Sequence, residues 1–323
     1  MNYSFFGTCA NDSKHLVECI KTIKDQSLLP KSVVIVDSGT KNQEKELLSL
    51  ISNKKIKLVY LFQDLPRVKA LNLAIKQTQS DYLIRFDTRT RFSKDYAKNA
   101  LKLMIDSKRK FVGGVPLVIP ENKKFMSLLA AGIMSRAYIF FYPRHRIEGY
   151  TGTSSSVYLG CFESEILKNT MYSDEINIVS EDSLLATNLS RKGFPPYISD
   201  SIRIKYVARG SLKNIFKLFR TYGFARANTL IGFRKLHSFK RYLIILLSLM
   251  FYFIFVPLGL LQKALTFPLL ILLYNFIGEI FYKKTNIIYA FLGTACQISW
   301  IVGFIFGLAG CLKIKNEKTN FIS

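Results

Sequence analysis

The sequence predicts an α/β fold with a mainly parallel sheet, followed by a basic interfacial segment and hydrophobic helices. Between residues 3 and 87, short apolar runs alternate with amphipathic helical patterns. Long uncharged runs begin at Tyr242. The 323 residues carry 46 Lys+Arg against 22 Asp+Glu, a net charge of +24, yet residues 242–323 contain only six basic and two acidic residues. Most of the charge therefore belongs to the less hydrophobic part.

The first half is expected to alternate strands with helices. Apolar, often β-branched runs predict strands at 3–8, 32–36, 56–61 and 82–86. Apolar residues at helical spacing predict helices at 16–23, 44–51 and 68–75. Because continuous apolar strands separated by helices are typical of parallel sheets, both faces of this sheet should be covered.

In open sheets of this kind, ligands bind beyond the carboxyl ends of the strands. Three polar clusters fall there, at 8–11, 37–40 and 87–91. Asp37 could accept hydrogen bonds from a base or ribose, or could merely open a turn. Asp87 could hold a divalent cation against a diphosphate, or could belong to an ordinary polar loop.

A pair of acids, Glu181 and Asp182, follows Ser180 and precedes a helical pattern that ends at Gly193. One interpretation is a serine N-cap with two acids that complement the helix dipole. The other is catalytic: one anion raises the proton affinity of its neighbour, which then serves as a general base. The two interpretations have equal weight on these residues alone.

The C-terminal part of the chain is expected to associate with a membrane. Three apolar segments could each cross a bilayer, at 242–261, 264–281 and 287–312. The positive-inside rule disfavours three crossings because it leaves the basic tail outside, and a single merged span over the first two segments would bury Lys263. We expect three spans, with the N-terminal part cytosolic because the apolar start is too short for a signal peptide.

A basic segment precedes the first apolar run. Residues 203–241 contain eleven basic residues and no acid. Within it, Lys213, Lys217 and Arg220 share one side of a predicted amphipathic helix at 211–236, which should lie among anionic lipid headgroups or pack partly on the domain. Nucleic-acid binding is a weaker interpretation of the same charge, because the basic residues adjoin hydrophobic spans.

Composition and cysteine content exclude several classes of protein. With 49% hydrophobic residues, the chain is neither disordered nor collagen-like. Its five cysteines are scattered and form no C-x-x-C pair, which argues against a structural zinc site and against a disulfide framework. The three histidines are isolated from one another in the sequence.

The order of these features resembles a family 2 glycosyltransferase with the GT-A fold, and in particular the membrane-bound type similar to succinoglycan-biosynthesis glycosyltransferases. The resemblance spans nearly the whole chain. Its motifs are individually weak, but their order and spacing are characteristic: Asn11, Val36-Asp37-Ser38-Gly39, Ala70-Leu71-Asn72, Ile84-Arg85-Phe86-Asp87, Asp95-Tyr96, Val112-Gly113-Gly114, Gly160, Asp174-Glu175, Glu181-Asp182, Arg209-Gly210-Ser211-Leu212, Tyr222-Gly223 and residues 300–307.

The resemblance implies roles for these residues. Asp37 would contact the nucleotide, Asp87 the diphosphate and a Mg²⁺ or Mn²⁺ ion, and Asp182, next to Glu181, would be the base of an inverting transfer. Further residues implied in binding the nucleotide sugar are Asn11, Lys69, Asn72 and Arg89. Those implied at the acceptor or membrane interface are Arg209, Lys213, Lys217, Arg220 and Tyr222. The implied domains are a cytosolic GT-A domain at 1–205, an interface segment at 206–241, membrane helices at 242–312 and a tail at 313–323.

The chain departs from the family pattern at two places. Arg89 stands where a second acidic or histidine residue is expected, so that either the guanidinium neutralises part of the diphosphate or a metal ligand is lost. Leu218 and Thr221 stand where Gln and Arg are expected before Tyr222-Gly223, which affects the acceptor contacts.

Three functions follow as hypotheses. The first is transfer of a sugar from a nucleotide-diphosphate sugar to a lipid-linked or growing-glycan acceptor in exopolysaccharide or surface-glycan synthesis, at a multi-pass cell-membrane protein. The second is direct transfer to polyprenyl phosphate. The third is a catalytically silent membrane protein that binds sugar nucleotides or acts as an interaction protein. None of them needs a nucleic-acid partner.

Overall fold

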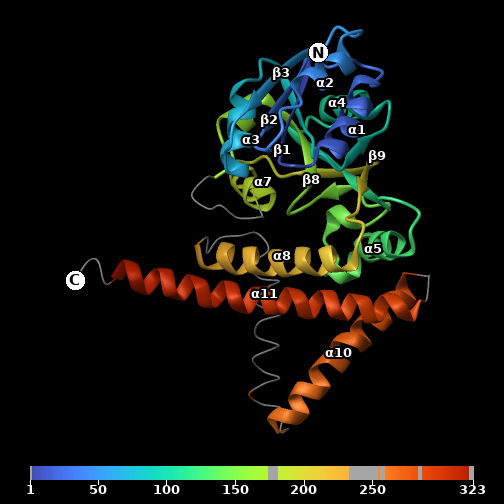
Figure 1. Cartoon of the computed structure of the whole chain (residues 1–323), viewed down its shortest axis with the longest axis vertical. Helices are drawn as coiled ribbons and strands as arrows, with labels where there is room; N and C mark the ends of the chain where they lie inside the picture. Colours follow the sequence, from blue (N-terminus) through green and yellow to red (C-terminus); the bar gives the residue numbers. More distant parts are fainter. Residues whose placement is uncertain (1, 174–180, 233–253, 255–258, 283–285, 320–323) are drawn as a thin grey trace. The chain divides into compact units, whose positions relative to one another are not determined.

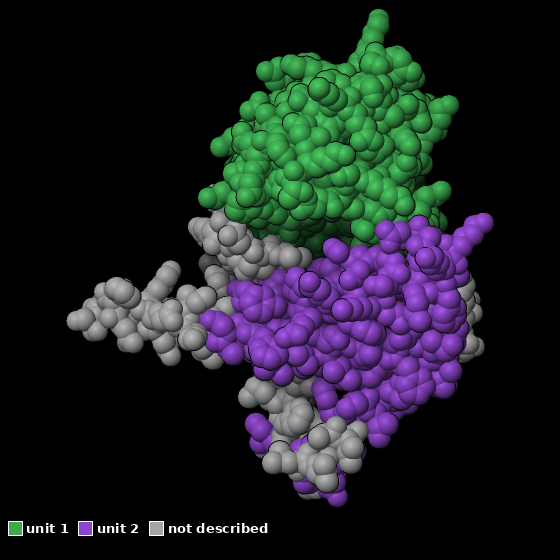
Figure 2. All heavy atoms as spheres, viewed as in Figure 1, with its two compact units in different colours: residues 1–119, 143–177, 181–208 green, residues 120–142, 178–180, 209–323 purple. Residues whose placement is uncertain are grey.

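The computed structural model describes residues 2–173, 181–232, 254, 259–282 and 286–319. The chain forms two compact units (Figure 2). The first, here called the sheet unit, comprises Met1–Ile119, Pro143–Asn177 and Glu181–Ala208. The second, the helical unit, comprises Pro120–Tyr142, Ile178–Ser180 and Arg209–Ser323.

The sheet unit is built on one mixed sheet (Figure 1). Its strands are β1 Tyr3–Cys9, β2 Ser32–Asp37, β3 Lys57–Phe62, β4 Tyr82–Arg85, β5 Thr90–Phe92, β6 Phe111–Ile119, β7 Gly152–Thr153, β8 Tyr158–Glu163 and β9 Tyr197–Val207. They are ordered β3-β2-β1-β4-β8-β6-β9-β5, and β7 pairs with β9. The part from β3 to β4 is wholly parallel, whereas β8 runs antiparallel to both of its neighbours.

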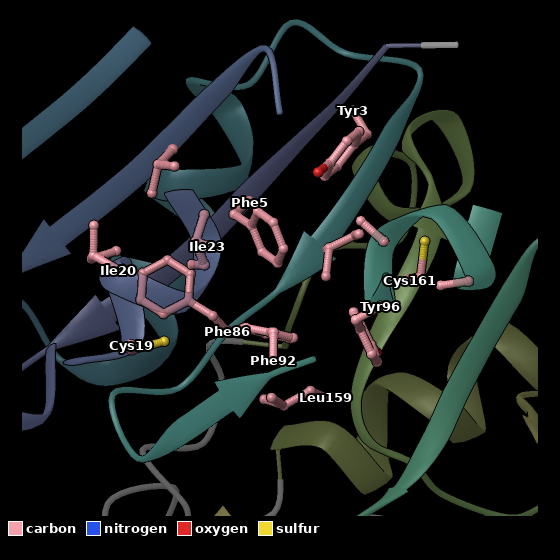
Figure 3. Close-up of a cluster of buried hydrophobic side chains, with 14 of the residues drawn as sticks. Tyr3, Phe5, Cys19, Ile20, Ile23, Phe86, Phe92, Tyr96, Leu159 and Cys161 are labelled. Carbon is pink, nitrogen blue, oxygen red and sulfur yellow. The ribbon is translucent and has the colours of Figure 1, made fainter. Parts of the chain in front are cut away.

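Helices cover both faces of this sheet. They are α1 Ser13–Lys24, α2 Glu44–Ile51, α3 Arg67–Lys76, α4 Tyr96–Asp106, α6 Ser164–Lys168 and α7 Glu181–Arg191, with a short 3₁₀ turn, η2, at Arg144–Arg146. Alternate residues of the strands point to opposite faces, so that Phe5 packs with α1, α2 and α4 while Phe6 packs with α3, α6 and α7. Figure 3 shows the first of these cores, where Phe5, Ile20 and Phe92 gather.

The structure confirms the expected α/β class. The four predicted strands and three predicted helices of the first half all form, within a few residues of their expected ends. The antiparallel strand β8 enters the sheet beside β4, because Leu83 and Ile84 pair with Phe162 and Cys161. The sheet is therefore mixed in its second half rather than parallel throughout.

The helical unit is made of long helices and one inserted segment. Its elements are α5 Phe125–Ser135, the 3₁₀ helix η1 Ala137–Phe140, α8 Leu212–Gly232, α10 Leu260–Phe281 and α11 Ile287–Thr319. The predicted amphipathic helix at 211–236 is confirmed as α8 up to Gly232; residues 233–236 lie outside the described part. Its apolar side is buried at Ile215 and Phe219, whereas Lys213, Lys217 and Arg220 are exposed.

Helices α8 and α11 pack backbone against backbone. A Cβ at Gly223 would collide with the carbonyl oxygen of Trp300, and a Cβ at Gly303 would collide with that of Arg220. Small residues let helix backbones approach this closely. The apolar side of α8 is thus covered by α11 within its own unit.

Polar side chains fasten α10 to its neighbours. The Arg136 guanidinium forms a buried ion pair with Glu279, which also accepts a 2.7 Å hydrogen bond from the Tyr138 hydroxyl. Asn275 donates a 2.8 Å hydrogen bond to Gln297 of α11. Buried polar groups need such partners, so these contacts fix which sides of the helices face each other.

The structure supports fewer membrane crossings than the sequence predicts. Among the described residues, one helix segment, Ile287–Gly310, is long and apolar enough to cross a bilayer. The expected second span corresponds to Thr266–Phe281, which is shorter than the roughly 20 residues that a crossing needs. Most of the expected first span, 242–261, lies outside the described residues. Of the three expected crossings, the described residues therefore provide one candidate helix.

Candidate active site

Asn11 and Asp12, which follow β1, link the polar loops at one edge of the sheet. The side-chain oxygen of Asn11 accepts hydrogen bonds from the backbone and the hydroxyl of Thr40, at 2.9 and 3.0 Å. Asp12 accepts a 2.8 Å hydrogen bond from the Thr88 hydroxyl and lies 3.4 Å from the Arg89 guanidinium. The loops that follow β1, β2 and β4 are therefore joined, as the strand-end rule predicts.

Asp37 ends β2 and is completely buried. One of its oxygens accepts a 2.8 Å hydrogen bond from the Gly39 backbone, and the other accepts bonds from Gln43, at 3.1 Å, and from the Tyr60 hydroxyl, at 2.6 Å. The carboxylate is thus satisfied within the protein, and it fixes the 37–43 loop. The remaining oxygen of Gln43, Oε1, is buried and has no hydrogen-bond partner among the described residues.

Asp87 follows β4 and meets a guanidinium from the start of α3. Its Oδ2 lies 3.2 Å from Nη2 of Arg67, whose Nε donates a 2.8 Å hydrogen bond to Glu181. Within the described residues, the hydrogen bonds to its Oδ1 are long, both 3.4 Å, and come from the Arg89 backbone and the Thr88 hydroxyl. Arg67 therefore bridges the strand-end carboxylate and the acid pair of α7.

Arg85 holds the acid pair from the end of β4. It is the last residue of β4 and its side chain is only 1% exposed. It donates a 2.9 Å hydrogen bond to Glu181 and forms an ion pair with Asp182. The side chain of Glu181 is 6% exposed and that of Asp182 31% exposed, so the second acid faces outward more than the first.

The charges of this cluster keep the acids ionised. Burial alone would raise the pKa of Glu181, but the guanidinium groups of Arg85 and Arg67 outweigh it and lower this pKa to about 2. Burial likewise opposes ionisation of Asp87, and Arg67 and Arg85 again lower its pKa below the ordinary value. At neutral pH, Glu181 is therefore an ionised anchor with little affinity for a proton.

Asn72 supports this cluster from α3. Its amide donates a 2.8 Å hydrogen bond to the carbonyl of Tyr172 and accepts a 2.9 Å bond from the backbone N–H of the same residue. The Tyr172 hydroxyl in turn accepts a 3.0 Å hydrogen bond from Arg85. Asn72 therefore reaches the acid pair through Tyr172, whereas Lys69 is exposed on the same helix.

The structure brings together most of the predicted site residues of the sheet unit. Asn11, Asp87, Arg89 and the acid pair are connected by the contacts above, and Asp37 adjoins them through the loop that carries Thr40. Arg89 is held by Asp12 and by a 3.4 Å hydrogen bond to the Ala208 carbonyl. The predicted interface residues, which are Arg209, Lys213, Lys217, Arg220 and Tyr222, belong to the helical unit.

Sequence reasoning gave no site role to Asp12, Arg67 or Arg85. A signal for Arg67 exists: it is the first residue of α3, where the helix dipole disfavours a positive charge, so its presence there needs another cause. Asp12 directly follows Asn11 at a strand end. The pairing of Arg85 with Glu181 joins residues 96 positions apart and has no local signal.

A divalent cation such as Mg²⁺ needs several oxygen ligands. Among the described residues, no three His, Cys, Asp or Glu side chains gather as a metal-binding group. Asp87 supplies hard oxygen, but one of its oxygens already meets Arg67. These residues therefore fit a cation that reaches Asp87 together with the oxygens of a diphosphate, since Mg²⁺ is commonly bound by one or two carboxylates plus substrate phosphates.

Comparisons with known proteins agree with this fold. Residues 4–163 match the family described as Glycosyl transferase family 2. Among curated proteins, none matches the sequence. One similar solved structure is the mannosyltransferase PcManGT from Pyrobaculum calidifontis in complex with GDP-Man and Mn²⁺, at 14% identity and a TM-score of 0.59, covering 94% of this chain and 87% of that one.

A second similar structure is S. aureus TarS 1–349 in complex with UDP-GlcNAc. It is 13% identical, has a TM-score of 0.50, and the match covers 97% of this chain and 92% of that one. At these identities the likeness shows a GT-A-like fold. The residues of the candidate site up to Arg89 lie within the matched range. The chain therefore contains a glycosyl transferase family 2 domain, which spans residues 4–163.

Proposed function

We propose that the protein transfers a sugar, with inversion, from a nucleotide-diphosphate sugar to a lipid-linked or growing-glycan acceptor. The observation that carries this proposal is the gathering of Asp87, Glu181 and Asp182 by Arg67 and Arg85. This cluster lies beyond the carboxyl end of β4, in a sheet whose residues up to 163 match glycosyl transferase family 2. Such an edge is where open α/β sheets bind ligands.

Asp182 is the proposed general base. It is the more exposed member of the acid pair, and Arg85 anchors it in place. A base must reach the acceptor hydroxyl, remove its proton and so strengthen its attack on the anomeric carbon. Glu181, with its low pKa and buried position, is proposed to hold Arg67 and Arg85 rather than to take the proton.

The proposed donor binds at the strand ends. PcManGT was solved with GDP-Man and Mn²⁺, and TarS with UDP-GlcNAc, which supports a nucleotide-diphosphate sugar as donor class. Asp87 would hold Mg²⁺ or Mn²⁺ against the diphosphate, a cation that neutralises the charge of the leaving group. The other residues proposed to bind the nucleotide sugar are Asn11, Asp37, Lys69, Asn72 and Arg89.

Membrane attachment is proposed through the helical unit. Large apolar side chains are exposed on three of its helices; Phe125, Leu269, Phe281 and Ile305 are 59–76% exposed. The basic side of α8 would meet anionic headgroups. A membrane-held enzyme encounters a lipid-linked acceptor at raised local concentration, as surface-glycan or exopolysaccharide synthesis would require. The three crossings and the cytosolic side of the catalytic domain stay predictions.

A second candidate is transfer to polyprenyl phosphate. The ion pair of Asp182 with the buried Arg85 favours it, because this carboxylate already has a charged partner within the protein. A phosphate acceptor is already an anion and needs little help from a base. The two candidates differ in acceptor and share the donor site.

The test measures donor binding and transfer by the full chain in detergent. Calorimetry with a panel of nucleotide sugars, with and without Mn²⁺, identifies the donor, and Asp182→Asn is then assayed with a hydroxyl acceptor and with polyprenyl phosphate. Loss of about 10²–10⁴-fold with the hydroxyl acceptor supports the base role. Asp106→Asn, an exposed aspartate of α4 paired with Lys102, is the matched control.

Three outcomes would redirect the proposal. Transfer by Asp182→Asn within about tenfold of the unaltered protein on a hydroxyl acceptor contradicts the base assignment. Unchanged transfer to polyprenyl phosphate selects the second candidate. Failure to bind any donor, with or without Mn²⁺, favours a catalytically silent membrane protein.

A further inference from the structure

We propose that the ion pair of Arg67 with Asp87 hinders cation binding in the donor-free site, so that a cation binds well only when a diphosphate also binds. The inference rests on the proposed function for the identity of the diphosphate, but the competition between Arg67 and a cation can be measured without any donor. It assigns Arg67 a positioning and coupling role that no motif of the sequence indicated.

The Arg67 side chain bridges Glu181, which is held firmly in place, and Asp87, which is more exposed. At the fixed end, Nε of Arg67 donates to Oε1 of Glu181 at 2.8 Å, and the same oxygen accepts from Arg85 at 2.9 Å. Arg85 is buried, so Glu181 is held in place. At the open end, Nη2 of Arg67 meets Asp87 at 3.2 Å, a longer contact on a carboxylate that is 29% exposed.

Arg67 is free to change partners, unlike Arg85. The side chain of Arg67 is 49% exposed, against 1% for Arg85. Its third nitrogen, Nη1, has no hydrogen-bond partner within the described residues. A half-exposed guanidinium that uses two of its three nitrogens can turn toward an incoming anion, and its planar fork suits phosphate oxygens.

The bridge works against a cation at Asp87. Oδ2 is the oxygen that Arg67 contacts, and the hydrogen bonds that the described part of the chain makes to Oδ1 are long, at 3.4 Å. A divalent ion that bound there would stand within a few ångströms of a positive guanidinium and would repel it. The donor-free protein is therefore expected to bind Mn²⁺ weakly.

A diphosphate removes this conflict. Its oxygens offer Arg67 an alternative partner and supply ligands that the cation lacks, so Oδ2 of Asp87 becomes available. Each ligand then strengthens the binding of the other, and by linkage the effect is reciprocal. The cation and the diphosphate are expected to enter as a coupled pair.

The experiment measures Mn²⁺ affinity of the donor-free full chain in detergent, by electron paramagnetic resonance of the free ion. Arg67→Gln should bind Mn²⁺ on the order of tenfold more tightly than the unaltered protein, because one repelling charge next to the ion is gone. Lys76→Gln removes the same charge from an exposed position on α3 and should change little. Arg67→Gln combined with Asp87→Asn should lose the gain.

A second variant guards against misfolding. Arg67→Lys keeps the positive charge but lacks the planar guanidinium that bridges two carboxylates. Its Mn²⁺ affinity should lie between those of the unaltered protein and Arg67→Gln. Mn²⁺ affinities of Arg67→Gln and Arg67→Lys that both stay within twofold of the unaltered protein would overturn the inference. A gain that persists without the Asp87 carboxylate would overturn it as well.

Binding of UDP and GDP is measured on the same samples. Nucleotide binding that Mn²⁺ strengthens in the unaltered protein, and strengthens less in Arg67→Gln, supports the coupling. Equal strengthening in both proteins contradicts it. If neither nucleotide binds, the proposed donor class fails, while the donor-free Mn²⁺ comparison still decides the competition between Arg67 and the cation.

Discussion

Glu181 offers the sharpest test of how the acid cluster is held. Replacing it with glutamine keeps the size of the side chain but removes the charge that balances Arg67 and Arg85. The lowered pKa of Glu181, about 2 against an ordinary value of 4.5, means that its ionised form stabilises the folded state. This stabilisation is fully present above the ordinary pKa and is lost as the pH falls from about 4.5 toward 2.

The magnitude follows from the difference between the two pKa values. At 1.36 kcal/mol per pKa unit, the shift corresponds to roughly 3 kcal/mol at neutral pH. Arg85 is buried, so the glutamine variant also leaves a buried charge with less compensation. Breaking a buried ion pair by removing one partner typically costs about 3–5 kcal/mol. We therefore expect Glu181→Gln to lose several kcal/mol of unfolding free energy at pH 7.

The assay is urea unfolding of the detergent-solubilised chain between pH 3 and 7, followed by far-ultraviolet circular dichroism. Below pH 4.5, the unfolding free energy should depend less on pH in Glu181→Gln than in the unaltered protein. The two slopes should differ by up to about 1.4 kcal/mol per pH unit. Glu163→Gln is the matched control, since its partner Lys110 is 41% exposed and such pairs contribute about 1 kcal/mol or less. Equal pH slopes in unaltered protein and Glu181→Gln would refute the reasoning.

Two further substitutions test the packing around the site and in the helical unit. Gly303→Val should separate α8 from α11 at the Arg220 carbonyl and lower the thermal unfolding temperature by several degrees. The control Gly310→Ala adds a methyl group in open space and should not lower this temperature. Equal unfolding temperatures of the two variants would contradict the close approach of the helices. Asn72→Ala removes both hydrogen bonds to the Tyr172 backbone and should cost about 1–3 kcal/mol by urea unfolding; a loss below about 0.5 kcal/mol would show that this brace is unimportant.

The arginines explain how this site departs from the pattern that the sequence resemblance implied. Arg89, which stands where a second acid or histidine was expected, pairs with Asp12 and the Ala208 carbonyl. Arg67 forms an ion pair with Asp87, the carboxylate that follows β4. Guanidinium groups thus surround the position expected for a diphosphate, and their planar forks suit phosphate oxygens.

The alternation of strands and helices was predictable because it is local. Apolar runs and helical spacing fix β1 to β4 and α1 to α3, and the parallel order of those strands brings the ends of β1, β2 and β4 to one edge. The acids at 37 and 87 could therefore be chosen from the sequence. The helix at 181–191 was predictable too, from its own apolar spacing.

Other features depended on contacts between distant segments. The strand β8 joins the sheet antiparallel beside β4, and nothing in its own residues determines that direction. The span expected at 264–281 is too short, because its apolar helical part covers only Thr266–Phe281. Two polar residues of this run, Asn275 and Glu279, bond to α11 and η1.

By itself, the sequence determined the α/β class, the strand ends where polar residues gather, and the hydrophobic character of the C-terminal part. Local periodicity and composition are enough for these, because they depend on neighbours along the chain. Only the tertiary structure decided which charges meet: Arg67 reaches Glu181 across 114 residues, and Arg85 reaches it across 96. Such pairings follow from the packing of α3, α7 and β4, and electrostatic interactions depend on distances in space that no spacing in the sequence records.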